Sequence, residues 1–284
     1  MLTLTTGCSS NPLSTSPPTI EPAQAAESPP TSQNPAGAVR PLAGHPQAAV
    51  FDSATHQLAV LSPGTDPAAP ASIVLFSATQ LGDTQAAPRD SPRVSPRVVA
   101  LSGPATALAA DDRGTAYVAA RGGYFVVDLA TAHATQVNIA EAQQVQFTAI
   151  ARRADGKLVL GSADGTVYTV ATASKDGTAA IDNRNKIFAS VDYLVTQGNT
   201  TVVLDRGQTS LTTIGADGHA EQALRAGEGA TTMAADPLGR VLVADTRGGE
   251  LLVYGVDPLI LRQAYPVRQA PFGLAGSRGL TWVS

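Results

Sequence analysis

Few side chains in this sequence have the types and spacing that catalysis or metal binding requires. The four histidines fall at unrelated places, and no two of them stand at the short spacing of metal ligands: His45, His56, His133 and His219. Most carboxylates that could join a cation site fall in predicted turns, where aspartate bonds nearby backbone amides: Asp155, Asp164, Asp176, Asp205, Asp217 and Asp245. We therefore predict no metal site and no cofactor.

One serine has the surroundings of a catalytic nucleophile. The pentapeptide Ala275-Gly276-Ser277-Arg278-Gly279 matches the loose form of a nucleophile elbow, which needs a strand, a sharp turn and a helix. Here the pentapeptide falls in an ordinary turn between two predicted strands. We therefore expect no catalytic role for Ser277 and favour a chain without catalysis of its own.

The single cysteine, Cys8, points to a different chemistry. One cysteine cannot form an intrachain disulfide. The stretch Thr6-Gly7-Cys8-Ser9-Ser10 resembles a bacterial lipobox, in which small residues precede a cysteine that receives a diacylglycerol group. Thr5 stands where that motif prefers an aliphatic residue, and the basic and apolar regions of a signal peptide are missing before it. We predict lipidation of Cys8, residues 1–8 as the remnant of a lipoprotein signal peptide, and a true start upstream.

Residues 9–45 have the composition of a flexible tether that precedes the repeat region. They are rich in Pro, Ser, Thr and Ala, and such a composition buries too little apolar surface to offset the entropy of ordering. We predict a disordered spacer of about 3 Å per residue where it is polyproline-like. It suits a domain held off the extracytoplasmic face of a cell membrane, and it would equally suit a linker without an anchor.

The remaining residues, 46–284, repeat one pattern. A small-residue stretch leads to a turn with Asp or Gly, then an apolar run, a second turn and another run. The turn glycines are Gly114, Gly156, Gly198, Gly239 and Gly279, at intervals of 42, 42, 41 and 40 residues. An earlier copy has His56 at the turn, 58 residues before Gly114, because an insertion follows its third strand. A period of about 40 to 45 with four short strands is typical of a β-propeller.

Each unit offers four strands, as in 106–111, 115–120, 124–129 and 134–139. One such sheet cannot bury both faces alone, and stacking the sheets around an axis buries them. We predict an all-β fold, a β-propeller of five full blades plus two strands of a sixth.

The unit from Gly239 to Asp245, followed by Glu250 to Tyr254, resembles the NHL and YVTN class of propeller repeat. The tether and the composition resemble actinobacterial propeller lipoproteins. The resemblance implies the fold and a lipid anchor, but it implies no particular ligand. The hallmark tetrapeptides of either class are degenerate or missing.

The count of strands leaves the ring short of the six to eight blades usual for such propellers. Residues 37–43 are expected to lend a closing strand to the last blade. An alternative is a chain shortened at its C-terminus, a remnant with an open sheet edge. We otherwise expect a monomer.

The insertion carries three arginines among prolines, Arg89, Arg93 and Arg97. Long propeller insertions lie on a rim and can bind ligands, so these arginines form a possible binding loop for an anion or an acidic partner. A solvated loop is the plainer interpretation.

The net charge of the chain limits the classes of partner that we expect. The formal net charge of −4 gives no basic footprint for nucleic acid. We expect a lipid-anchored binding scaffold for an unidentified protein or small molecule. The alternative is a metal-dependent lactonase or hydrolase on the same fold.

Overall fold

The computed structural model describes residues 18–27, 30, 42, 45–66, 68–78, 95–171, 177–277 and 280–284. Every named element of these residues is a β-strand, and the strands form six sheets. Within this part of the chain, no helix is long and apolar enough to cross a membrane. Cys8, Arg89 and Arg93 lie outside the described residues, as does all of 37–43 except Leu42.

Each blade is an antiparallel meander whose strands pair in chain order. Blade one contains β1 (Ala48–Asp52), β2 (Gln57–Ser62), β3 (Ser72–Ser77) and β4 (Arg97–Ala100). Blade two contains β5 (Ala105–Ala110), β6 (Thr115–Ala120), β7 (Gly123–Asp128) and β8 (His133–Ile139). Blade three contains β9 (Phe147–Arg152), β10 (Leu158–Ser162), β11 (Thr166–Val170) and β13 (Ile181–Lys186). Blade four contains β14 (Tyr193–Gln197), β15 (Thr200–Asp205), β16 (Ser210–Ile214) and β17 (Ala220–Arg225). Blade five contains β18 (Ala230–Ala235), β19 (Arg240–Asp245), β20 (Glu250–Val256) and β21 (Leu259–Pro266).

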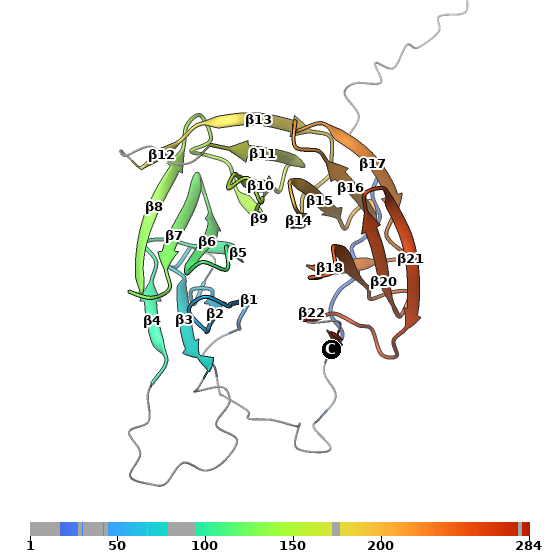
Figure 1. Cartoon of the computed structure of the whole chain (residues 1–284), viewed down its shortest axis with the longest axis horizontal. Helices are drawn as coiled ribbons and strands as arrows, with labels where there is room; N and C mark the ends of the chain where they lie inside the picture. The colour runs from blue at the N-terminus through green and yellow to red at the C-terminus, as the bar shows by residue number, and fades with distance from the viewer. Residues whose placement is uncertain are drawn as a thin grey trace, which may run out of the picture.

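The blades stand around a common axis, with the first strand of each blade innermost and the fourth outermost (Figure 1). A two-stranded sheet of β22 (Leu274–Ser277) and β23 (Leu280–Val283) follows blade five. Its residues Leu274 and Val283 pack against Leu242 and Leu251 of blade five. The predicted propeller of five full blades and two further strands is therefore confirmed.

Four of the five predicted turn glycines are also confirmed, and the fifth, Gly279, lies outside the described residues. Gly114, Gly156, Gly198 and Gly239 have φ angles of 96°, 91°, 62° and 80°, in the region that favours glycine. His56 takes the same place in blade one, with φ of 54°. Local turn residues therefore set the first hairpin of each unit. For this reason the repeat length of about 42 residues can be recognised in the sequence.

Apolar side chains fill the spaces between neighbouring blades. Leu61 and Ile73 of blade one share a cluster with Val118 and Phe125 of blade two. Similar clusters join blades two and three, three and four, and four and five. Each fully buried side chain of this size contributes about 1.5–3 kcal/mol, so the interfaces between blades hold the ring together.

The meander gives the propeller two different faces. The hairpin face carries the turns between first and second strands, at 53–56, 111–114, 153–157, 198–199 and 236–239. The opposite linker face carries the turns between second and third strands. It also carries the connections from blade to blade, at 101–104, 140–146, 187–192, 226–229 and 267–273.

Blade two has a fifth strand that the sequence did not predict. The short strand β12 (Thr178–Ala179) leaves the connection between β11 and β13 of blade three and pairs in parallel with β8. The pairing joins Thr178 to Asn138 and Ala179 to Ile139. An outer blade edge of this protein thus accepts an added strand.

Candidate functional site

Threonines on the innermost strands link each blade to the next. Thr106 donates its hydroxyl hydrogen bond to the carbonyl of Phe147 at 2.7 Å. Thr148 donates to the carbonyl of Val191 at 2.5 Å, and Thr232 makes the same kind of contact with Phe272. Each of these hydroxyls donates to a backbone carbonyl of the next unit, so the bonds link neighbouring units around the axis.

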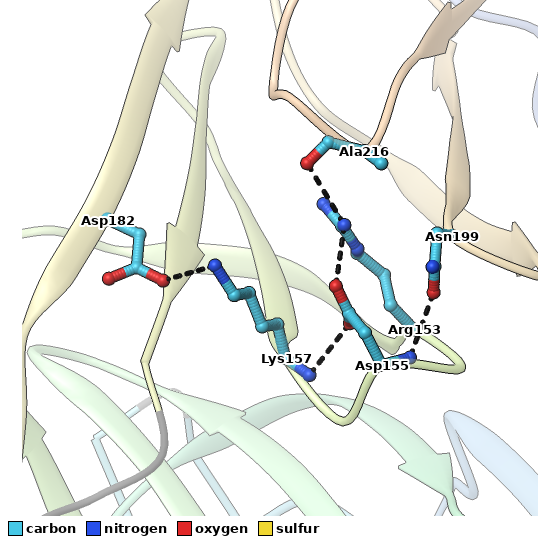
Figure 2. Close-up of polar contacts among 6 residues, drawn as sticks. All are labelled: Arg153, Asp155, Lys157, Asp182, Asn199 and Ala216. Carbon is cyan, nitrogen blue, oxygen red and sulfur yellow. Dashed lines mark hydrogen bonds and ion pairs between the residues drawn. The ribbon is translucent and has the colours of Figure 1, made fainter.

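A charged group spans blades three and four on the hairpin face. Arg153 follows β9, and its side chain is only 3% exposed. Its Nη2 lies 2.7 Å from Oδ2 of Asp155 and 3.0 Å from the carbonyl oxygen of Ala216 in blade four. Figure 2 shows the guanidinium reaching between the two turns. A cation this deeply buried needs both acceptors.

The neighbours of Arg153 complete the same network. The backbone amide of Asp155 donates to Oδ1 of Asn199 at 2.8 Å. Lys157 pairs with Asp182 at 2.8 Å (Figure 2). Each charged group of this cluster thus has an oppositely charged partner, although the buried Nε of Arg153 has no hydrogen bond to a described residue. The arrangement therefore stabilises the junction between blades.

Blades four and five leave an open hollow on the hairpin face. It has a volume of about 530 Å³, within the range of ligand and side-chain sites. Its lining comes from both blades: Gln197, Thr200, Leu238, Gly239, Arg240, Gly255, Val256, Asp257 and Arg262. Leu238 is 64% exposed at its rim.

The two arginines of the hollow differ in their partners. Arg240 pairs with Asp236 at 2.5 Å, and the Asp236 side chain is 1% exposed. Arg262 has no ion pair or side-chain hydrogen bond to any described residue. Its guanidinium lies over Gly255, where an added Cβ would stand 2.4 Å from Nε. The hollow therefore offers, among the described residues, the unpaired cation of Arg262 and the exposed side chain of Leu238.

Beneath the hollow the two blades are rigidly joined. Tyr254 is 1% exposed and donates its hydroxyl to the carbonyl of Arg225 at 2.9 Å. Burial raises the pKa of Tyr254 to about 12, with a smaller contribution from the charge of Asp245. The phenol therefore stays neutral at physiological pH. The amide of Leu259 donates to Oε1 of Gln222 at 2.6 Å, which fixes the outer strands.

Arg97 is the one arginine of the predicted binding loop that the structure describes. It begins β4, and its guanidinium donates to Oε1 of Gln57 at 2.8 Å. It also donates to the carbonyls of Leu129 at 2.7 Å and Ala130 at 2.8 Å in blade two. Arg97 therefore joins blades one and two. Anion binding by the loop stays a prediction, as does lipidation of Cys8.

The other sequence candidates lie apart. Ser277 ends β22 opposite Leu280, which confirms the hairpin setting expected for it. Among the described residues, no three His, Cys, Asp or Glu side chains gather to hold a metal ion.

The buried turn aspartates bond backbone amides, as the sequence indicated. Asp245 is 1% exposed and accepts from the amides of Glu228, Gly229 and Gly248 at 2.8–3.0 Å. Asp205 does the same in blade four. These carboxylates fasten the connection from blade to blade onto the second-to-third-strand turn of the linker face.

Sequence reasoning missed the hollow of blades four and five. One signal was present, because Leu238 occupies the place before the turn glycine that Arg113 and Asp155 hold in other units. An apolar residue at a turn position that is charged elsewhere marks an exposed contact. No sequence pattern indicated that the side chain of Arg262 lies over Gly255. This position depends on a register shift in the pairing of β20 with β21.

Comparison with known proteins identifies the fold and no closer relation. No protein-family model and no curated protein sequence matches the chain. Among solved structures, a chain from "Crystal Structure of Mitotic Checkpoint Complex" superposes with a TM-score of 0.57 at 13% identity. The match covers 80% of this chain and 69% of the other. At this identity the likeness supports the β-propeller fold alone.

Proposed function

We propose that this protein is a binding scaffold, a lipid-anchored extracytoplasmic β-propeller that holds a protein partner on its hairpin face. The observation that carries the proposal is the hollow between blades four and five, where Leu238 is exposed and Arg262 is unpaired among the described residues. The neighbouring junction of blades three and four satisfies its own charges. The open contact therefore lies at the junction of blades four and five and not at the neighbouring one of blades three and four.

The chemistry of the hollow favours a protein over a small charged metabolite. An exposed leucine next to a free guanidinium suits a partner that brings an apolar side chain and a carboxylate together. Propellers present turns around an axis, and binding sites are grafted onto these turns. One solved chain of similar fold comes from a structure of the Mitotic Checkpoint Complex, which agrees with this use of the fold.

A photo-crosslinking experiment on intact cells tests the partner site. The photoreactive residue benzoyl-phenylalanine replaces Leu238 in one protein and Arg113 in another. Arg113 holds the same turn position in blade two and is also exposed. We expect a discrete crosslinked partner from position 238 only, and we expect Arg262→Glu to remove it while Arg113→Glu in the Leu238 crosslinker protein leaves it. Crosslinks of equal yield from both positions, or indifference to Arg262→Glu, would contradict the proposal.

The membrane anchor belongs to the same proposal and has its own test. The lipobox-like residues around Cys8 and the proline-rich tether support it. Protein extracted from membranes is expected to carry the mass of acyl chains at Cys8, and Cys8→Ser is expected to release the propeller into the soluble fraction. An unmodified Cys8 in membrane-extracted protein would exclude the anchor and leave the partner site to be judged separately.

A further inference from the structure

A segment of the predicted tether lies against the linker face of blades four and five. The amide of Ile20 donates to the carbonyl of Gly207 at 2.8 Å. Arg247 donates to the carbonyl of Glu21 at 2.8 Å, and Arg206 donates to the carbonyl of Ala23. Residues 19–24 are therefore held by their backbone.

The two arginines come from the same kind of turn in neighbouring blades, one residue apart in the repeat. Arg206 is the first residue of the turn after β15, and Arg247 is the second residue of the turn after β19, so both lie in second-to-third-strand turns on the linker face. Each donates to a carbonyl oxygen of the segment and not to a side chain. Ile20 is 45% exposed. Such contacts recognise an extended backbone and depend little on the side chains it carries.

The groove is shaped for a small residue at one position. Ala23 is 8% exposed, and a Cβ built on Gly229 would stand 3.0 Å from the Cβ of Ala23. A Cβ on Gly207 would come within 3.2 Å of Thr19. Pro22 fixes its own φ and favours the extended chain that the contacts require. Larger residues at position 23 would clash with the blade.

The segment does not fill its groove. A hollow of about 340 Å³ remains between residues 21–24 and the side of the groove formed by Thr246, Arg247 and Ala270. Three hydrogen bonds join the described part of the segment to the blades, at Gly207, Arg247 and Arg206. A contact of this kind is easily exchanged.

We propose that the linker-face groove of blades four and five is a binding site for an extended peptide strand, and that residues 19–24 occupy it in cis. Arg206 and Arg247 supply main-chain recognition, and the glycines admit the strand closely. A free peptide with the same extended, proline-containing chemistry enters the groove once the cis segment is displaced.

Exchange at this groove would change the reach of the tether. With residues 19–24 bound, only Ser9 to Pro18 separate Cys8 from the propeller, at most about 33 Å of chain at about 3.3 Å per residue. With the segment released, residues 19–46 add to this length, because the amide of Gln47 already donates to the carbonyl of Leu61 in blade one. This consequence rests on the proposed lipid anchor, whereas the groove itself does not, and the experiment below needs no membrane.

The test uses the full chain and a fluorescent peptide of residues 18–27. In the variant Ile20→Pro/Ala23→Arg, the amide donor is lost and the small residue is enlarged, so the cis segment should leave the groove. Both changes lie outside the blades, and an unaltered melting temperature checks that the ring is intact. We expect this variant to bind the peptide at least about tenfold more tightly than the native chain, because the cis segment has a high effective concentration.

Arg247→Ala in the emptied variant is expected to reduce peptide binding at least about tenfold. Its side chain is exposed, so loss of folding is not the expected cause. The matched control is Arg121→Ala, at the corresponding turn of blade two, where the arginine donates to Gln144 instead. In the native chain the Ile20 amide should exchange with solvent more slowly than the amide of a free peptide. Failure of the emptied variant to bind at millimolar peptide, or free-chain exchange at Ile20, would overturn the proposal.

Discussion

The hydroxyl of Thr106 donates to the carbonyl of Phe147 over 2.7 Å and so joins the innermost strands of blades two and three. Thr148 makes the equivalent bond one blade later. The bonds lie near the axis, where neighbouring strands approach most closely. The small residues of these inner strands thus do more than relieve crowding, because they also carry the polar links between blades.

Removing one of these links should destabilise the ring measurably. Thr106→Val keeps the shape of the side chain and deletes the donor, so we expect a loss of about 1 kcal/mol in the free energy of unfolding. Urea denaturation followed by circular dichroism measures it. Thr135→Val on the exposed outer strand β8 is the control and should change stability by less than about 0.5 kcal/mol. Equal losses in both variants would show that the axial bond contributes nothing special.

The ion pair of Arg153 and Asp155 predicts a definite order for the stability losses of three variants. Asp155→Asn leaves a guanidinium that is 3% exposed without its counter-charge, so we expect it to cost more than Arg153→Met. The methionine fills similar space and removes the buried charge, at a cost of about 2 kcal/mol. Lys157→Ala breaks an exposed pair and should cost at most about 0.5 kcal/mol. Chemical denaturation of the three variants checks the order, and a larger loss in Arg153→Met would refute it.

Asp245 should be among the most sensitive polar residues of blade five. Asp245→Ala leaves three backbone donors without an acceptor, those of Glu228, Gly229 and Gly248. We expect a loss of at least about 3 kcal/mol, since each orphaned buried donor carries a penalty of about 1–3 kcal/mol. Asp217→Ala, which removes one bond to an exposed amide, is the comparison and should cost no more than about 1 kcal/mol. Similar melting temperatures for the two variants would argue against this role.

The lowered pKa of Asp164 predicts how the free energy of unfolding changes with pH. Partial burial raises the pKa of its carboxyl, but hydrogen bonds from Ser162, Thr166 and Lys186 and the Lys186 charge outweigh burial and lower the pKa to about 2. The ordinary value is 3.8. A lowered pKa means that the ionised carboxylate stabilises the fold fully above about pH 4 and that this contribution is lost as the pH falls toward 2.

The Asp164→Asn variant tests that dependence. Its stability deficit relative to the native chain should be constant from pH 7 to about pH 4 and should shrink between pH 4 and pH 2. Because the side chain is 49% exposed, solvent screening limits the deficit to on the order of 1 kcal/mol or less. Thermal melts across this range measure it. A deficit that stays constant down to pH 2 would mean that the carboxylate gains nothing from its neighbours.

The hairpins of each blade were predictable because their determinants are local. The turn glycines needed a positive φ, the alternating runs needed a pleated strand, and the period of about 42 residues repeated both. The first hairpin of the irregular first unit was also predicted correctly, since His56 adopts the left-handed conformation that glycine takes in the other units. The insertion also fell where the sequence placed it, between β3 and β4.

By itself, the sequence thus determined the all-β propeller, the five full blades with their extra hairpin, and the turns. Only the tertiary structure decided which side chains meet between blades. Arg153 reaches Ala216 across 63 residues, and Arg206 reaches Ala23 across 183. The hollow beside Leu238 and the groove that holds residues 19–24 depend on the angle and spacing of whole blades. Sequence patterns report the local turns of a chain, whereas contacts of this range are set by how the sheets pack around the axis.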